Sequence, residues 1–206
     1  MAIRDVSIDS RLLESAREQF KRKGFLAAQL TDICKDAGIT TGAVYKRYKG
    51  KEELFEAVVK DTVESMNAIL DETKAVDPNK LSDKELIAVW VDTERNTREW
   101  NRRLMEMRGG LELLLRCSEG TKYSRFHEQW LEKMSDIDYE YLKVLQDRDL
   151  ADKSITRMEL HVMVSALWQL YTEPIIHGMS DAEVEHHCKV VGNLFNWSKA
   201  VGIKEK

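Results

Sequence analysis

Apolar residues recur at intervals of three and four positions along most of this chain, and short breaks, several marked by glycine, separate the runs. This spacing places apolar side chains on one face of an α-helix, whereas a half-buried strand would need strict alternation. With only ten glycines and two prolines in 206 residues, the composition also disfavours a sandwich or a barrel. We therefore predict an all-α fold. The expected helices are residues 8–23, 29–37, 41–48, 51–75, 82–108, 109–118, 121–148, 156–177 and 181–201.

Other simple features exclude several classes of protein. No uncharged apolar stretch approaches the roughly 20 residues that a bilayer-spanning helix needs, and residues 1–11 hold no apolar run of a signal peptide. Cys34, Cys117 and Cys188 are widely spaced, which indicates reduced thiols rather than a disulfide framework or a zinc site. We expect a cytoplasmic protein with no membrane segment, no cofactor and no metal.

The charge of the chain is unevenly distributed. The whole protein has a formal net charge of −4, yet residues 21–51 contain eight Lys or Arg side chains against Asp32 and Asp36. A compact basic segment in an acidic chain indicates a module that binds a polyanion. On charge alone, a solvated surface with no partner is the simpler interpretation.

The first fifty residues carry helix-ending and helix-starting signals in a regular order. Gly24 and Gly38 follow the first and second predicted helices, Thr40 can cap the third, and Gly50 ends it. Three short helices joined by glycine turns are typical of a helix-turn-helix unit. Helix 41–48 then takes the position of the recognition helix, which enters the major groove of DNA.

A set of residues in this segment matches a known family in register. They are Leu12, Leu13, Ala16, Phe20, Gly24, Phe25, Asp32, Ile33, Cys34, Ala37, Gly38, Ile39, Thr40, Gly42, Val44, Tyr45, Tyr48, Lys51, Glu52 and Leu54. With them, residues 12–54 resemble the DNA-binding domain of the tetracycline-repressor (TetR) family of bacterial transcription regulators. The resemblance implies a DNA-binding domain at 1–50, a connecting helix at 51–75, and a larger helical effector-binding and dimerisation domain at 76–206.

Two positions depart from the family's pattern. The second helix usually starts with a capping Thr or Ser, whereas this chain has Ala28 and Gln29. We therefore expect a side-chain cap that is weak or that comes from Gln29 or Thr31. Gly50 stands where Ser, Asn or Asp often precedes the fourth helix. The first departure puts a phosphate contact at the second helix in doubt.

The expected DNA contacts lie on and beside helix 41–48. Small residues at its start let the backbone approach the major groove, Tyr45 offers a hydroxyl to a phosphate, and Lys46 can reach a phosphate or a guanine edge. Lys51 starts the next helix, where backbone N–H groups favour an anion. The predicted DNA-binding residues are Gln29, Thr31, Thr40, Thr41, Gly42, Ala43, Tyr45, Lys46 and Lys51.

The chain beyond residue 76 offers aromatic side chains and hydroxyls on predicted buried stripes. Two hydroxyls between tryptophans are unusual in a dry core and suit a ligand cavity between helices 82–108, 121–148 and 156–177. An apolar or aromatic molecule there could pivot helix 51–75. For any single residue, ordinary core packing is the alternative. The predicted ligand-binding residues are Met66, Leu70, Trp90, Thr93, Thr97, Trp100, Met107, Phe126, Trp130, Trp168 and Tyr171.

The resemblance also implies a homodimer through helices 156–177 and 181–201, with Val191 and Leu194 as interface positions and Gly192 permitting close approach. Two recognition helices would then read a double-stranded, palindromic DNA operator. The function predicted is a transcriptional repressor that a small molecule releases from its operator. One alternative is a helix-turn-helix protein with no small-molecule effector. The other is a small helical enzyme, which the lack of a Gly-rich phosphate loop, a nucleophile elbow or an HExxH motif disfavours.

Overall fold

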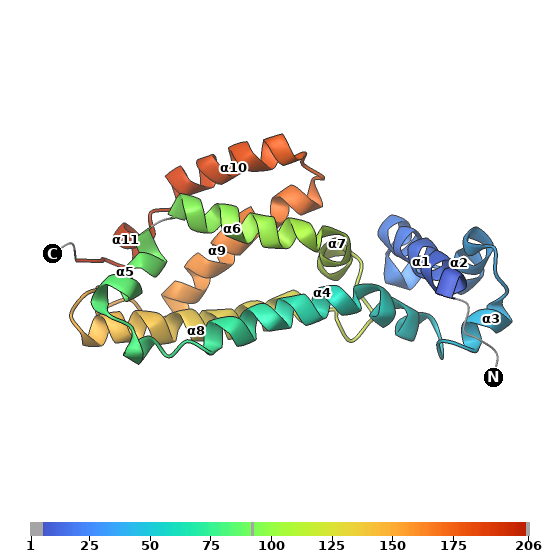
Figure 1. The fold of residues 1–206 in the computed structure, drawn as a ribbon, viewed down its shortest axis with the longest axis horizontal. Helices are drawn as coiled ribbons and strands as arrows, with labels where there is room; N and C mark the ends of the chain where they lie inside the picture. The colour runs from blue at the N-terminus through green and yellow to red at the C-terminus, as the bar shows by residue number, and fades with distance from the viewer. Residues whose placement is uncertain (1–5, 92, 205–206) are drawn as a thin grey trace. The chain divides into compact units, whose positions relative to one another are not determined.

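The computed structural model describes residues 6–91 and 93–204, without the side chains of residues 6, 7 and 93. Over this range the chain is helical and contains no strand, which confirms the all-α prediction (Figure 1). The helices, in chain order, are α1 (Val6–Ala27), α2 (Leu30–Ala37), α3 (Thr41–Tyr45), α4 (Lys51–Lys74), the 3₁₀ turn η1 (Pro78–Lys80), α5 (Asp83–Val91), α6 (Thr93–Glu106), α7 (Arg108–Arg116), α8 (Phe126–Asp147), α9 (Arg157–Ile176), α10 (Asp181–Leu194) and α11 (Trp197–Ala200).

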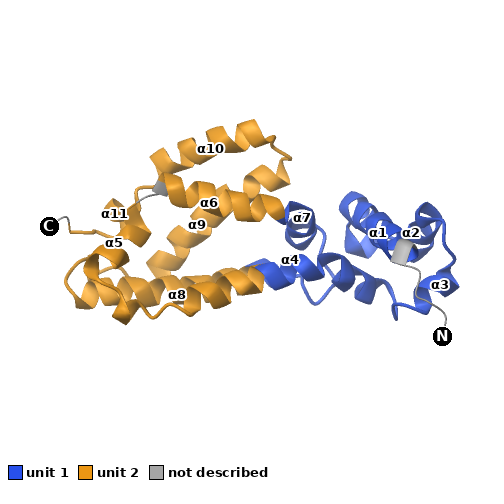
Figure 2. Cartoon of the chain, viewed as in Figure 1, with its two compact units in different colours: residues 1–65, 107–127 blue, residues 66–106, 128–206 orange. Residues whose placement is uncertain are grey.

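The helices group into two compact units (Figure 2). Unit 1 contains the residues up to 65 together with 107–127, and unit 2 contains 66–106 and 128–206. Helix α4 contributes to both units. The segment 107–127 was predicted as part of the carboxyl-terminal domain, but it packs with the first three helices in unit 1.

Unit 1 is built on a cluster of phenylalanine rings. Phe55 is fully buried and meets Phe20 and Phe25 edge-on, with ring centroids 5.1 and 5.5 Å apart. Leucines of α7 belong to the same core, which explains why this helix groups with unit 1. An ideal Cβ on Gly110 would lie 2.0 Å from Thr62 Oγ1, so glycine is what lets α7 lie directly against α4 here.

The glycine signals near the start of the chain lie where the sequence predicts them. Gly38 has φ 65° and ψ 38°, and its N–H donates to the carbonyls of Cys34 and Lys35 at the end of α2. Gly24 has φ 72° and ψ 164°, which breaks the helical path of α1 three residues before its end. These two turns set the direction of α2 relative to α1 and of α3 relative to α2.

Three helices predicted beyond residue 80 differ in their bounds from the helices of the structure. The expected single helix 82–108 is two, α5 and α6, and Asn96 Nδ2 donates to the carbonyl oxygen of Val89 across their junction at 3.1 Å. The expected helix 181–201 is also two, because Phe195 is extended and Asn196 caps α11 by accepting from the N–H of Lys199. Helix α8 starts at Phe126 rather than at residue 121. Residues 121–125 form turns instead, in which the Thr121 hydroxyl accepts from the backbone N–H of Tyr123.

Candidate nucleic-acid interface and ligand cavity

Helix α3 has one buried side and one open side. Its only fully buried residue is Val44, which packs in the core of unit 1, while Tyr45 is 62% exposed. The side chain of Thr40 accepts a hydrogen bond from the N–H of Ala43 at 3.3 Å and so caps the helix, as predicted. The helix therefore presents polar side chains outward, while the packing of Val44 in the core of unit 1 holds the helix in place.

The structure places most of the predicted DNA-binding residues on the surface of unit 1. Ala43 and Lys51 are half-buried, and the exposed members are Gln29, Thr31, Thr40, Thr41, Gly42, Tyr45 and Lys46. Gln29 precedes α2 and makes no side-chain cap, which confirms the weak start predicted for that helix; its amide donates instead to the carbonyl oxygen of Ala27 at 3.4 Å. Five members of the exposed set lie near the amino-terminal ends of α2 and α3, whereas Tyr45 and Lys46 lie at the carboxyl-terminal end of α3.

Lys51 has a different role from the predicted one. Its Nζ donates to the carbonyl oxygens of Phe25, Leu26 and Ala28 at 2.6, 3.1 and 2.9 Å, and lies 4.5 Å from the centroid of the Phe25 ring. Partial burial lowers the pKa of this ammonium. An ammonium has three N–H donors, and all three are used here. The side chain therefore ties the end of α1 to the start of α4 and has no donor left for a phosphate.

Other cations of the basic segment are also held by partners within the chain. Arg47 Nε donates to Asp9 Oδ1 at 2.5 Å, and its Nη1 donates to the carbonyl oxygen of Ala43 at 3.2 Å, so it fixes the end of α3 to α1. Lys21 pairs with Glu112 and Lys23 with Asp32. Within the described residues, no ion pair is recorded for Arg22, Lys35, Lys46 or Lys49. Sequence reasoning counted all eight bases alike, because their partners lie far away in the chain.

Unit 2 contains a cavity of about 440 Å³. Helices α5, α6, α8 and α9 supply most of its wall, with Thr73 from α4 and Trp197 from α11. Its aromatic rings lie close together: the Trp130 ring is 4.9 Å from that of Trp168 and 6.2 Å from that of Trp100, centroid to centroid. The lining residues are Thr73, Glu85, Ala88, Val89, Trp90, Arg95, Asn96, Glu99, Trp100, Trp130, Leu131, Met134, Asp138, Val164, Leu167, Trp168, Tyr171 and Trp197.

Some predicted ligand-binding residues line this cavity and others do not. Those in the lining are Trp90, Trp100, Trp130, Trp168 and Tyr171. Thr97 is fully buried behind the wall, where its Oγ1 lies 3.5 Å from the Tyr171 hydroxyl. The side chain of Thr93 lies outside the described residues.

The other four predicted ligand-binding residues do not line the cavity. Met66 and Leu70 are buried in α4, where the carbonyl oxygen of Met66 accepts from Trp130 Nε1 at 2.7 Å. Phe126 packs against Tyr123 in unit 1, and Met107 belongs to unit 1 as well. The cavity therefore meets α4 at Thr73, one turn beyond the residues predicted to move that helix.

The sequence analysis did not predict several polar groups of the cavity wall. Burial raises the pKa of the Asp138 carboxyl to about 7. The indole N–H groups of Trp90 and Trp168 are buried, and no acceptor for them exists among the described residues. A carboxylate at four- and eight-residue spacing from Met134 and Trp130 was the signal available, since those positions share one helix face.

Apolar side chains are also exposed on α9 and α10, at Met158, Val162, Val190 and Leu194. Val191, which was predicted at a dimer interface, is instead 1% exposed within the single chain. An ideal Cβ on Gly192 would lie 2.9 Å from the Cβ of Glu94, so this glycine permits close approach of α10 to α6 rather than to a second chain. The open side of α10 is the face that carries Val190 and Leu194.

The described residues contain neither a membrane-spanning helix nor a metal site. No helix in that range is long and apolar enough to cross a bilayer. Likewise, no group of three or more His, Cys, Asp or Glu side chains within residues 6–91 and 93–204 is arranged to hold a metal ion. All three cysteines are free thiols.

Comparison with known proteins gives the family of the amino-terminal segment. Residues 12–58 match the sequence model of a family described as bacterial regulatory proteins, tetR family. Over 50 residues the chain is 38% identical to the HTH-type transcriptional regulator UidR of Escherichia coli (strain K12), an alignment that covers 24% of this chain and 26% of UidR. The chain thus spans about a quarter of the length of that curated relative.

Similar solved structures cover the whole chain. A TetR-like transcriptional regulator from Rhodococcus sp. RHA1 superposes with a TM-score of 0.62 at 14% identity, covering 97% of this chain and 99% of that one. The transcriptional regulator FadR from Bacillus subtilis, solved in complex with stearoyl-CoA, gives a TM-score of 0.53 at 14% identity, with 95% and 100% covered. At this identity the likeness concerns the fold.

Proposed function

Because the chain belongs to the TetR family of bacterial regulatory proteins, we propose that it is a repressor that binds a palindromic DNA operator as a homodimer and leaves it when a small molecule occupies unit 2. The observation that carries the DNA-binding part is the two-sided α3 helix. Val44 holds it in the core, while Tyr45 and Lys46 are exposed. A short, firmly packed helix that exposes polar residues at both its ends suits the major groove.

The dimer part is supported by the exposed apolar side chains of α9 and α10. Met158, Val162, Val190 and Leu194 are 49–67% exposed, and a second copy of the chain would cover them. Each chain supplies one recognition helix, and a palindrome has two half-sites related by the same two-fold symmetry. Leu194→Glu would place a charge in that face and should yield monomers, measured by sedimentation, with operator affinity at least about tenfold weaker.

The effector part is supported by the cavity in unit 2. A helix-turn-helix protein without an effector has no need of a space of about 440 Å³ among tryptophan rings. The unpaired indole N–H groups of Trp90 and Trp168 also favour a ligand with a hydrogen-bond acceptor, because buried donors otherwise lose free energy. The similar FadR structure holds stearoyl-CoA, so an acyl thioester is one candidate for comparison.

Helix α4 provides a route between ligand and DNA contacts. Thr73, near its last residue, lines the cavity, and Lys51, its first residue, holds the carbonyls at the end of α1. A ligand that shifts the Thr73 end acts on the same helix that orients the DNA-binding helices. A differential affinity of about 1–3 kcal/mol between the two states is enough for regulation.

The test begins with selection of bound sequences from a double-stranded library that contains a random central segment. We expect a palindromic site, and affinity for it that falls steeply with salt concentration. Lys46→Ala should cost about 1–3 kcal/mol of binding free energy if Lys46 contacts a base edge. Lys84→Ala, an exposed lysine of unit 2, is the matched control and should leave affinity unchanged. Enrichment of no sequence, or an equal effect of both variants, would contradict the proposal.

A further inference from the structure

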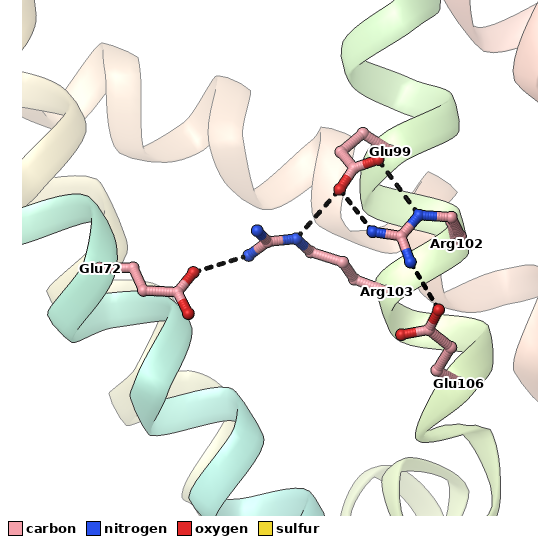
Figure 3. A network of polar contacts seen from close by, with 5 residues as sticks. All are labelled: Glu72, Glu99, Arg102, Arg103 and Glu106. Atoms are coloured by element: carbon pink, nitrogen blue, oxygen red, sulfur yellow. Dashed lines mark hydrogen bonds and ion pairs between the residues drawn. The ribbon is translucent and has the colours of Figure 1, made fainter.

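Three carboxyl side chains line the cavity, and two of them are already paired. Glu85 accepts hydrogen bonds from the backbone N–H and the hydroxyl of Ser82 at 2.8 and 2.7 Å. Glu99 accepts from Arg102 and Arg103 at 2.7 and 3.2 Å, in a network that continues to Glu72 of α4 and Glu106 (Figure 3). These pairings lower the pKa of both carboxyls, so both are ionised. Two arginines neutralise Glu99, whereas Glu85 keeps its charge and is satisfied by uncharged hydrogen-bond donors.

Asp138 is the third carboxyl, and it differs from the other two. No hydrogen bond or ion pair to it is recorded among the described residues, and burial is the sole cause of its raised pKa. Arg95 also lines the cavity, but its side chain is exposed and interacts with another residue. Asp138 is half-buried, and a carboxylate without a partner beside aromatic rings is costly, which favours a ligand that pairs with it.

Helix geometry places Asp138 among the aromatic rings. Trp130, Met134 and Asp138 are four residues apart on α8, so their side chains share one face of the helix, and all three line the cavity. The rings of Trp100 and Tyr171 are stacked with centroids 6.2 Å apart, and Trp100 in turn meets Trp130 edge-on. This part of the wall thus combines the Asp138 carboxyl with electron-rich ring faces.

We propose that this cavity selects an organic cation with an aromatic or apolar body, whose positive charge pairs with Asp138 and whose body packs between the tryptophans. The inference rests on the proposed role of the cavity as the effector site and adds the charge of the ligand. A cation is attracted both to the carboxylate and to tryptophan faces, most strongly where water is excluded. A neutral acyl chain would leave the carboxyl without a partner, and an anion would be repelled by it.

The pH dependence of binding follows from the same pairing. A permanently charged cation binds the ionised form of Asp138, so its affinity should rise about tenfold between pH 6 and pH 8 as a carboxyl with a pKa of about 7 loses its proton.

The other ionisable groups of the cavity wall do not titrate in that interval. Glu85 and Glu99 have lowered pKa values, burial raises that of Tyr171 to about 12, and arginine stays charged. Around the wall, the pKa of Asp77 is lowered and that of Tyr141 raised. His161 of α9 bonds Ser135 on α8 at 2.9 Å, outside the lining, so His161→Gln serves as a control for the pH profile.

The experiment measures binding to the 206-residue protein by isothermal titration calorimetry with three probes that share a naphthyl body. They are (2-naphthylmethyl)trimethylammonium, its neutral analogue with carbon in place of nitrogen, and 2-naphthylacetate; stearoyl-CoA is a fourth ligand. The cation should bind at least tenfold more tightly than the neutral analogue, and the anion most weakly. Asp138→Asn should remove that preference while leaving the neutral probe unchanged. Glu140→Gln removes an exposed charge from the same helix and should change nothing.

Several results would overturn the inference. They are absence of cation binding, equal affinity for the cation and its neutral analogue, tighter binding of stearoyl-CoA, or a preference that survives Asp138→Asn. If Asp138→Asn fails to fold, the affinities of the wild-type protein for the three probes and the pH dependence of cation binding test the inference instead. Operator binding is measured in parallel, which separates the two claims. DNA binding without cation binding refutes the inference alone, and cation binding that leaves operator affinity unchanged refutes only the proposed effector role.

Discussion

The cores of the two units use aromatic side chains in opposite ways. In unit 1, Phe20, Phe25 and Phe55 meet each other directly, and Phe20 and Phe55 are fully buried. In unit 2, tryptophan rings surround a cavity of about 440 Å³, beside the half-buried carboxyl of Asp138 and two buried indole N–H groups that lack an acceptor. The difference is the one that the proposed function requires, with a close-packed unit 1 that holds the surface of α3 in place and a unit 2 that has space for a ligand.

The largest effect is expected from removing the charge of Asp138. Its folded-state pKa of about 7 lies above the unfolded value near 3.8, so ionisation opposes folding as the pH rises between them. At about 1.4 kcal/mol per pKa unit, Asp138→Asn should raise the free energy of unfolding by about 2–4 kcal/mol above pH 7 and by nothing below pH 4. Urea unfolding of both proteins from pH 4 to pH 8 measures this, and a gain that does not vary with pH would contradict it.

Substitutions that add atoms to the core of each unit test the difference in packing between them. Gly110→Ala puts a Cβ against Thr62 in unit 1 and should cost about 1–3 kcal/mol, because that core has no room to yield. Val164→Phe adds a ring to the cavity wall of unit 2, where space exists, and should cost less than about 1 kcal/mol. Thermal unfolding followed by circular dichroism compares the two. Equal destabilisation would mean that the units do not differ in packing as described.

The smallest expected effect concerns Lys51. Lys51→Met keeps most of the apolar stem and removes the ammonium from three backbone carbonyls, so we expect a loss of about 1–2 kcal/mol in stability. Because no donor is left for a phosphate, the salt dependence of DNA binding should keep its slope. A slope reduced by about one unit would instead indicate a direct phosphate contact. Measurement of operator affinity at several salt concentrations distinguishes these outcomes.

Features that depend on neighbouring residues in the chain could be predicted from the sequence. Thr40 caps α3, Gly38 ends α2, and Val44 is buried, because a cap, a left-handed turn and a helical stripe are each specified within a few positions. The exposure of most of the predicted DNA-binding residues follows from the same local register.

Features that depend on distant partners could not. Lys51 was predicted as a DNA contact because it starts a helix, and nothing local in the sequence revealed the carbonyls it binds, which lie 23–26 residues away. Val191 was assigned to a dimer interface although its face of α10 packs inside the chain. Trp197 joined the cavity only because the chain bends at Phe195 and Asn196; the capping pattern at Asn196 was the signal that could have revealed it.

The central claim is that the exposed side of α3 reads DNA while the rest of unit 1 holds it in place. Fluorescence anisotropy of a labelled duplex that carries the selected site tests this most directly, with wild-type protein and the Tyr45→Ala, Lys46→Ala double variant. Both side chains are exposed, so the variant should fold normally. We predict that it binds at least about 100-fold more weakly, equivalent to about 2.7 kcal/mol. Unchanged affinity in the folded double variant would contradict the account.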